Sequence, residues 1–263
     1  KLKDALRVAS RLDATPPIVI LMNSEATHDA TLEHLESHDF FGYPRDRVWT
    51  FLQCWSVRFN VDGTLYRDPE GRVSYHGPGH GDVVACLQNS GLLERFQAEG
   101  GRHLLLSNVD NIVARMDPAL FGAHLAQPES ISVEVVERWV GDQGGAPYMV
   151  DGRMQIVESF RLPPSLDVTA VPVFNTNTFW IDISALAEPV ELTWFVVRKS
   201  LAGTPVIQFE RLVGEITGHV DSAFIHVPRD GLETRFIPIK TPADLETSRA
   251  AILGAMDSPR ECT

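Results

Sequence analysis

The sequence predicts an α/β protein with a mixed, mostly parallel central sheet, and two patterns carry this prediction. Residues 18–22 are apolar throughout and rich in β-branched side chains, they stop at Asn23-Ser24, and a helical pattern follows. After about residue 130, apolar and polar residues alternate, which is typical of strands with one exposed face. The 263 residues contain no repeat or linker, so we expect a single domain over residues 1–263.

The first half of the chain supplies helices and buried strands. Apolar residues at helical spacing predict helices over residues 2–12, 28–37, 82–88 and 92–98. Continuous apolar runs predict buried strands over residues 18–22, 48–52 and 103–106. Between these, the turn signals Asp62-Gly63 and Pro69-Glu70-Gly71 predict a small antiparallel excursion over residues 59–74.

The second half is richer in short strands. We expect them at residues 130–139, 156–158, 171–180, 195–199, 206–209, 223–227 and 236–240. A hairpin turn is predicted at Asp151-Gly152, a flexible loop over residues 141–145, and a helix over residues 210–216. Thr241-Pro242-Ala243-Asp244 combines a cap, a proline in the first turn and an acid at the third position, so the last helix should begin there.

Polar residues follow three of the predicted buried strands. They are Asn23-Ser24, Gln53 and the run of residues 107–111. Because the carboxyl ends of parallel strands meet at one edge of a sheet, we expect these groups to share an edge. Open α/β sheets bind their ligands at this edge.

The stretch Tyr75-His76-Gly77-Pro78-Gly79-His80-Gly81-Asp82 has the composition of a binding loop. Glycines and a proline in so short a span cannot pack a core, and they leave backbone amides open to a ligand before a helix begins near Val83. By itself the stretch also fits an ordinary turn capped by Asp82. The polar strand ends around it favour the binding loop.

Two side chains near these strand ends suit phosphate chemistry. Asp110 follows a buried strand and is flanked by Asn108 and Asn111, a set of oxygen ligands that suits Mg²⁺. The same aspartate would also serve as an Asx turn or a helix cap. His80 lies among glycines where its ring would reach a phosphate, although a lone histidine is often purely structural.

Three basic residues and two amides complete the candidates. Lys240, with Arg229 and Arg235 shortly before it, offers positive charge for a triphosphate, unless it is a plain surface lysine. Asn175 and Asn177 are separated by one residue, which places both amides on one face of a strand. They suit sugar hydroxyls or, alternatively, form an exposed polar face.

Composition excludes several classes of protein. With 23 basic and 35 acidic residues, the net charge of −12 disfavours nucleic acid and anionic membranes as partners. No apolar run is long enough to span a bilayer, and no signal peptide is present. The three cysteines lack metal-ligand spacing, so we expect a reducing, cytoplasmic setting with Cys54 and Cys86 buried. His34 and His38 are four apart, but Glu36 is misplaced for a zinc motif, so we expect a solvated helix face.

Seven short motifs occur in an order that resembles a known family. They are Leu21-Met22-Asn23-Ser24, Phe51-Leu52-Gln53, Pro78-Gly79-His80-Gly81-Asp82, Asn89-Ser90-Gly91-Leu92-Leu93, Ser107-Asn108-Val109-Asp110-Asn111, Phe174-Asn175-Thr176-Asn177 and Pro238-Ile239-Lys240-Thr241. Together they resemble the eukaryotic-type UTP-glucose-1-phosphate uridylyltransferases over residues 16 to about 253. Seven motifs in order are far more specific than any one of them.

The resemblance implies a Rossmann-like, GT-A-like nucleotidyltransferase fold and an enzyme that makes UDP-glucose and pyrophosphate from UTP and glucose 1-phosphate. It implies catalytic roles for Lys240, His80 and Asp110, with Mg²⁺ as cofactor at Asp110. The resemblance places the remaining substrate contacts at Met22, Gln53, Gly79, Asn108, Gly144, Gly145, Glu158, Asn175 and Asn177. The uridine would be held by Met22, Gln53 and Gly79, and phosphates by His80 and Lys240.

Two departures from the family pattern leave other functions open. The family's first strand and basic, glycine-rich loop do not precede residue 18, so we expect this chain to lack them. Gln143 stands where the family usually has a lysine. The alternatives are a pyrophosphorylase for another UDP-sugar and a non-catalytic nucleotide-sugar binding protein. A glycosyltransferase is disfavoured because Asp110 has no second acid two residues away.

Overall fold

The computed structural model describes residues 1–142 and 144–257, and contacts divide the chain into two compact units. Unit 1 consists of Lys1–Pro17, Arg102–Glu188 and Ile216–Thr263, and unit 2 consists of Ile18–Gly101 and Pro189–Glu215. The expectation of a single domain stays a prediction. Each unit is described by itself below.

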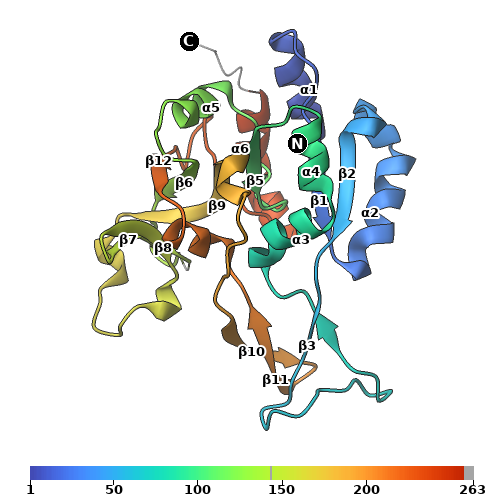
Figure 1. The fold of residues 1–263 in the computed structure, drawn as a ribbon, viewed down its shortest axis with the longest axis vertical. Coiled ribbons are helices and arrows are strands. Elements are labelled where there is room, and N and C mark those ends of the chain that lie inside the picture. Colours follow the sequence, from blue (N-terminus) through green and yellow to red (C-terminus); the bar gives the residue numbers. More distant parts are fainter. Residues whose placement is uncertain (143, 258–263) are drawn as a thin grey trace. The chain divides into compact units, whose positions relative to one another are not determined.

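Unit 1 is built on a four-stranded mixed sheet in the order β12-β6-β9-β5 (Figure 1). β12 (Ser222–His226) runs parallel to β6 (Ile131–Glu137), whereas β9 (Val173–Asp182) runs antiparallel to β6 and to β5 (His103–Ser107). The mixed sheet is confirmed, but fewer of its pairs are parallel than we expected. β9 is buried over most of its length, and a fully buried strand carries no alternation from which its direction can be predicted.

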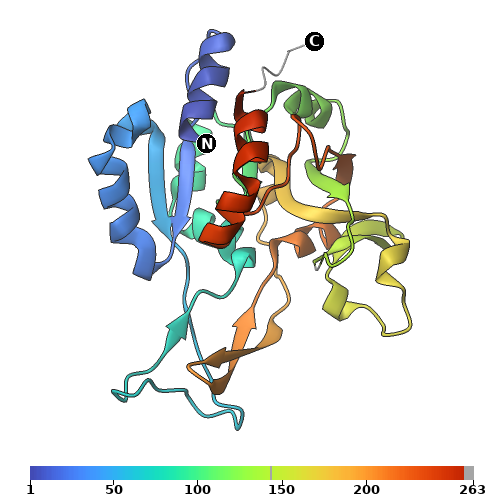
Figure 2. The ribbon, with the colours of Figure 1, turned by 180° about the vertical axis from the view of Figure 1, so that it is seen from behind.

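A hairpin and three α-helices accompany this sheet among the described residues of unit 1. β7 (Ala146–Val150) and β8 (Arg153–Val157) pair through the predicted turn, where φ is 50° at Asp151 and 79° at Gly152. The helices are α1 (Leu2–Arg11), α5 (Pro118–Leu125) and α6 (Pro242–Asp257). Figure 2 shows α1 and α6 side by side, and Arg115 binds both, through Asp4 and the carbonyl of Ala255.

Strand β6 corrects a sequence prediction, because it is buried on both faces and has no exposed face along residues 131–136. Its polar residues have buried partners: Ser132 bonds with His124, and Glu134 accepts hydrogen bonds from Trp180 and Arg235. Apolar and polar residues do alternate along this strand, but its polar side chains are buried and form hydrogen bonds with other buried side chains.

Unit 2 contains the parallel pair β1 (Val19–Asn23) and β2 (Val48–Leu52), with helices α2 (Glu25–Ser37), α3 (Val83–Asn89) and α4 (Leu92–Ala98). Short antiparallel pairs join β3 (Ser56–Val57) to β4 (Tyr75–His76) and β10 (Phe195–Leu201) to β11 (Thr204–Glu210). Bridges from Phe59 to Leu65 and from Arg67 to Val73 confirm the predicted excursion. The predicted helix starting at residue 28 begins three residues earlier, at Glu25.

Short 3-10 helices lie at Asp39–Gly42, Arg45–Arg47, His80–Asp82, Ser159–Arg161, Val168–Ala170, Ile183–Leu186 and Val213–Gly218. The last of these replaces the α-helix predicted over residues 210–216, because β11 continues to residue 210. The strand predicted over residues 236–240 is also wrong. In that stretch only Pro238 forms a bridge, to Asn111, and a proline has no N–H to extend a ladder.

Within the described residues, none of the helices combines the length and the apolar character needed to cross a bilayer. Cys86 is buried as predicted, but Cys54 is exposed, which contradicts the expectation that both are buried. Cys54 follows β2 at a point where the chain leaves the sheet, so its side chain has no strand neighbours to cover it.

Candidate functional site

The glycine loop of unit 2 is clamped by the segment that follows β11. The amide of Gly81 donates to the carbonyl of Arg211 (2.8 Å), and the amide of Arg211 donates to the carbonyl of Pro78 (2.7 Å). A Cβ on Gly79 would lie 2.5 Å from the Arg211 carbonyl oxygen, and φ at Gly79 is 87°. Glycine is required here by close backbone approach. The prediction that the loop's amides are open to a ligand is therefore wrong for Gly81.

Gln53 joins this loop to the end of the β1–β2 pair. Its amide nitrogen Nε2 donates to the carbonyl of Gly79 (2.8 Å), and its backbone amide donates to the carbonyl of Asn23 (2.8 Å). A Cβ on Gly77 would come within 2.5 Å of Gln53 Oε1. Met22 lies on β1 in register with Phe51 on β2. The polar ends of β1 and β2 thus meet as expected, and the glycine loop lies against one of them. The third predicted strand, β5, belongs to a different sheet and pairs with the antiparallel β9, so the prediction that three strand ends share one parallel edge is wrong.

His80 is fixed in one tautomer. Its Nδ1 accepts a hydrogen bond from the backbone amide of Val213 (3.1 Å), so the proton of the neutral ring is on Nε2. Burial lowers the pKa of His80 below its ordinary value of 6.5. A neutral imidazole with a single N–H donor is the result.

Asp82 is not the helix cap that the sequence allowed, since its side chain caps no amide. Its fully buried carboxylate instead pairs with Arg211. Burial raises the pKa of Asp82, and the charge of Arg211 opposes that shift. Arg211 also lies over the ring of Trp194, 4.2 Å from its centroid. Arg211 was missed at the sequence level, because nothing in its local sequence distinguishes it from a surface arginine.

In unit 1, the loop after β5 is joined to β9 by amide side chains. Asn177 Nδ2 donates to Asn108 Oδ1 (2.8 Å), and the backbone amide of Asn177 donates to Asn175 Oδ1 (2.9 Å). A bulge shifts the β6–β9 register here, and Asn177 has φ of 60°. The predicted simple alternation that would put both asparagines on one face is therefore broken. The bulge aims Asn177 toward Asn108 instead.

The same loop is tied to the segment that carries Lys240. Buried Asn111 accepts from the amide of Ile237 (3.1 Å) and donates to the carbonyl of Arg235 (3.0 Å). The amide of Ile239 donates to the carbonyl of Asp110 (2.9 Å). The backbone of exposed Lys240 is held in turn by Asp244 at the start of α6. Asn111 thus has a structural role, and it sets the position of Lys240 relative to this loop.

The carboxylate of Asp110 has the surroundings that a ligand of Mg²⁺ requires. Its half-buried carboxylate accepts no hydrogen bond from the described residues, and one free carboxylate beside a phosphate is a usual donor set for Mg²⁺. Lys1, which the sequence did not single out, donates through Nζ to Ser107 Oγ (2.8 Å) and the Asn108 carbonyl (2.9 Å). Burial lowers the pKa of Lys1 to about 8, with Arg235 acting in the same direction and Asp110 opposing it.

The residues that the resemblance places at the sugar lie together in unit 1. The amide of Asn175 donates to the carbonyl of Gly145 (2.9 Å), and a Cβ on Gly145 would lie 2.9 Å from Glu158 Oε1. A Cβ on Gly144 would meet the Phe174 ring at 3.3 Å. Burial raises the pKa of Glu158 above its ordinary value, and Arg161 opposes that shift. Gln143 lies outside the described residues.

Two of the three basic residues that we expected near the triphosphate form ion pairs with acidic residues of the protein. Buried Arg235 pairs with Glu134, and Arg229 binds Asp142 (2.8 Å from Nη2 to Oδ1) while stacking over Trp139. Asp142 is thereby held in the loop that we expected to be flexible. Of the three basic residues proposed for the triphosphate, only Lys240 forms no ion pair within residues 1–142 and 144–257.

The predicted site residues are divided between the units. Met22, Gln53, Gly79 and His80 belong to unit 2, and Asn108, Asp110, Gly144, Gly145, Glu158, Asn175, Asn177 and Lys240 belong to unit 1. Within each unit the structure brings most of them together through the contacts given above. The sequence motifs found these residues, but they did not reveal the partners Arg211 and Lys1.

Several solved structures share this fold. A UDP-glucose phosphorylase from Trypanosoma brucei has a TM-score of 0.77 at 26% identity, covering 92% of this chain and 56% of that one. A UDP-glucose pyrophosphorylase variant from Leishmania major, solved in complex with UDP-glucose, has a TM-score of 0.75 at 24% identity, covering 92% and 57%. The expected Rossmann-like nucleotidyltransferase fold is confirmed.

Sequence comparison also finds uridylyltransferases. UTP–glucose-1-phosphate uridylyltransferases from Astragalus penduliflorus and Hordeum vulgare are 29% and 28% identical over 242 residues, or 86% of this chain. The chain spans half the length of each of these two relatives. The family model described as UTP–glucose-1-phosphate uridylyltransferase matches residues 2–256. Because that match covers nearly the whole chain, the protein belongs to the UTP–glucose-1-phosphate uridylyltransferase family.

Proposed function

We propose that this protein catalyses uridylyl transfer from UTP to glucose 1-phosphate, giving UDP-glucose and pyrophosphate. The observation that carries the proposal is the set of contacts that holds the glycine loop of unit 2, at residues that the resemblance assigns to the nucleotide. Gln53 Nε2 donates to the Gly79 carbonyl, and His80 Nδ1 accepts from the Val213 amide. The curated relatives bear the name of this activity, and one solved relative binds UDP-glucose. Without these contacts the glycine loop would not be held in place, even if the motifs were present.

In unit 2, the side chain of Gln53 favours uracil over cytosine. Uracil presents one N–H donor between two carbonyl acceptors. Gln53 Nε2 is occupied by the Gly79 carbonyl, so the remaining polar atom of the side chain, Oε1, is an acceptor for the uracil N–H. Cytosine lacks that donor and would leave Oε1 unpaired, which is the kind of mismatch that gives strong discrimination.

Each unit offers one group to a phosphate, His80 in unit 2 and Lys240 in unit 1. His80 offers its Nε2–H as a donor, and Lys240 offers a mobile positive charge in a protein whose overall charge is −12. Asp110 would hold Mg²⁺, which when bound neutralises charge on the phosphate oxygens. The glucose 1-phosphate oxygen attacks the α-phosphorus in line with the departing pyrophosphate. Positioning and charge stabilisation supply the acceleration, and no covalent protein intermediate is needed.

The sugar would lie against the amides of unit 1. Asn108, Asn175 and Asn177 combine donors and acceptors, as hydroxyl groups require, and their mutual hydrogen bonds limit their rotation. Glu158 adds a carboxyl group whose raised pKa reflects its burial. These groups support a hexose as the ligand of unit 1.

The first test is calorimetric binding of UDP-glucose with Mg²⁺, compared with ADP-glucose and UDP-N-acetylglucosamine. We expect UDP-glucose to bind at least about tenfold more tightly than ADP-glucose, a difference of ~1.4 kcal/mol. Gln53→Ala should weaken UDP-glucose binding by a similar factor, whereas Gln97→Ala on the exposed face of α4 should not. Equal binding of the uridine and adenine nucleotides would contradict the proposal. Tighter binding of UDP-N-acetylglucosamine than of UDP-glucose would show that the preferred sugar is N-acetylglucosamine and not glucose.

Turnover is tested by pyrophosphate release from UTP and glucose 1-phosphate. Lys240→Ala should reduce the rate strongly while the unfolding transition stays within about 0.5 kcal/mol of the wild type, because the side chain is exposed. Full activity in that variant would exclude the role proposed for Lys240.

A further inference from the structure

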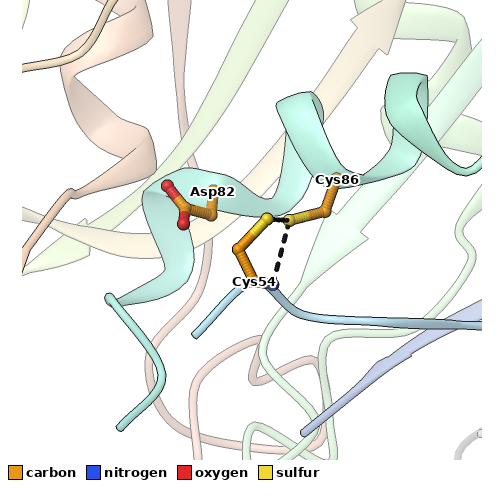
Figure 3. Close-up of side chains that lie close together, drawn as sticks. All are labelled: Cys54, Asp82 and Cys86. Atoms are coloured by element: carbon orange, nitrogen blue, oxygen red, sulfur yellow. Dashed lines mark hydrogen bonds between the residues drawn. The ribbon is translucent and has the colours of Figure 1, made fainter. Parts of the chain in front are cut away.

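Two cysteines that are 32 residues apart in sequence meet at the base of the glycine loop in unit 2. Cys54 directly follows Gln53, and Cys86 lies in α3, which begins where the loop ends. Their sulfur atoms are 2.8 Å apart, and the backbone amide of Cys54 donates to Cys86 Sγ (3.2 Å) (Figure 3). The Asp82 carboxylate lies within 4.8 Å of both sulfurs. Cys54 is exposed and Cys86 is buried.

We propose that Cys54 and Cys86 are a modification site that closes into a reversible intramolecular disulfide when a hydroperoxide reacts with the exposed thiol. A disulfide has an S–S distance of about 2.05 Å, so closing the bond shortens the present separation by less than about 1 Å. This inference concerns the thiols alone and stands independently of the uridylyltransferase activity.

The geometry favours a sulfur–sulfur bond over a metal site. Two thiolates bound tetrahedrally to zinc at about 2.3 Å lie roughly 3.8 Å apart, well beyond the 2.8 Å found here. The third possible ligand, Asp82, is already paired with Arg211. A metal would have to separate the sulfurs and compete with the guanidinium.

The exposure of the two thiols sets the order of the reaction. The Cys54 thiolate attacks the hydroperoxide, so its S–O bond forms while the O–O bond breaks and an alcohol leaves. Cys86 then attacks the sulfenic sulfur of Cys54, forming the S–S bond and releasing water, with the Cys86 proton passing to the departing hydroxide. The two thiols lose two electrons in total, and the peroxide gains them.

Burial of Cys86 makes it a poor first nucleophile. Its pKa is raised to about 12, first by burial and then by the contact with Cys54. The pair therefore has one thiol that meets the oxidant and a second that resolves the product.

The test is peptide mapping without reductant after treatment with hydrogen peroxide, in a Cys262→Ser background that removes the third thiol. We expect a cross-link between the peptides of Cys54 and Cys86 that dithiothreitol reverses. Cys86→Ser should instead leave a sulfenic acid on Cys54 that dimedone traps, and Cys54→Ser should leave Cys86 unmodified under the same treatment.

Three results would overturn the inference. They are free thiols at both positions after treatment, oxidation of Cys54 to the sulfinic acid without a cross-link, and protection from oxidation that is lost on chelation of bound zinc. The last result would identify the cluster as a metal site. Folding of each serine variant is checked by its urea transition, so that a missing cross-link is not caused by unfolding.

Discussion

At the scale of single residues, the feature that matters most for stability is the buried pair of Glu134 and Arg235. Arg235 donates to both carboxylate oxygens (2.9 and 2.5 Å) and to the carbonyl of Arg115 (2.8 Å), and Trp180 donates to Glu134 (2.9 Å). Both charged side chains are almost fully buried. Removing one member of such a pair leaves the other charged, desolvated and unpaired.

We therefore expect Glu134→Gln to lower the free energy of unfolding by about 3–5 kcal/mol in urea titrations. Glu246→Gln is the matched control. This variant removes an ion pair between Glu246 and Arg249, whose side chains are 68% and 60% exposed, respectively. Exposed ion pairs contribute only ~0–1 kcal/mol to stability. Similar losses in the two variants would contradict the importance given to burial.

The sequence could not have revealed this pair. Glu134 alternates with valines, which is typical of a strand with a wet face, and Arg235 lies 101 residues away. The sequence singled out Gln53 and His80 by their local setting, and the structure shows each of them hydrogen-bonded in or against the glycine loop. Chemistry that depends on a distant partner, such as Arg211 with Asp82, was not predicted, because no local pattern encodes the partner.

At the scale of elements, local sequence predicted structure well wherever the elements are self-contained. The bounds of α4 and β2 agree with the prediction, and the capping box at Thr241 and Asp244 starts α6 as expected. The misses are elements defined by tertiary contacts. Residues 236–240 were apolar enough for a strand, but Asn111 side-chain bonds hold them in place of a ladder. Helix α5, with its Asp117-Pro118 start, was overlooked although its cap signal was present.

The glycine loop offers a comparison between two glycines with the same backbone angle. Gly79 and Gly63 both have φ of 87°, but a Cβ at Gly79 would collide with Arg211 whereas one at Gly63 would meet nothing within 4 Å. We expect Gly63→Ala to cost about 1–2 kcal/mol of stability, from backbone strain alone, and to leave UDP-glucose binding unchanged.

Gly79→Ala should in addition displace the clamp and reduce UDP-glucose affinity by at least tenfold, measured by calorimetry. Equal affinities in the two alanine variants would show that the left-handed angle alone, and not the contact with Arg211, requires glycine at Gly79.

At the scale of the whole molecule, buried histidines link stability to pH. Burial lowers the pKa of His76, His80 and His124 below the ordinary value of 6.5. As the pH falls through about 6.5, the unfolded chain takes up protons that the folded chain does not, so the free energy of unfolding decreases. Each histidine contributes at most about 1.4 kcal/mol per pH unit. Asp82 and Glu158, whose pKa values are raised, act in the opposite direction.

His124→Gln isolates one such contribution, because His124 is buried and bonded to Ser132. Urea midpoints at pH 7.5, 6.5 and 5.5 should fall less steeply for this variant than for the wild type. A wild-type slope in His124→Gln would mean that this histidine titrates alike in the folded and unfolded states.

The division into interleaved units has a consequence for synthesis on the ribosome. The last segment of unit 2 ends at residue 215. Unit 1 includes Lys1–Pro17 but also needs the segment after residue 215. Until β12 has been synthesised, β6 has no parallel neighbour, and until α6 has been synthesised, Arg115 has no Ala255 carbonyl to bind. The earlier segments of unit 1 thus lack these partners until the segment after residue 215 has been synthesised, whereas unit 2 has all of its segments by residue 215. Such non-local pairing slows folding.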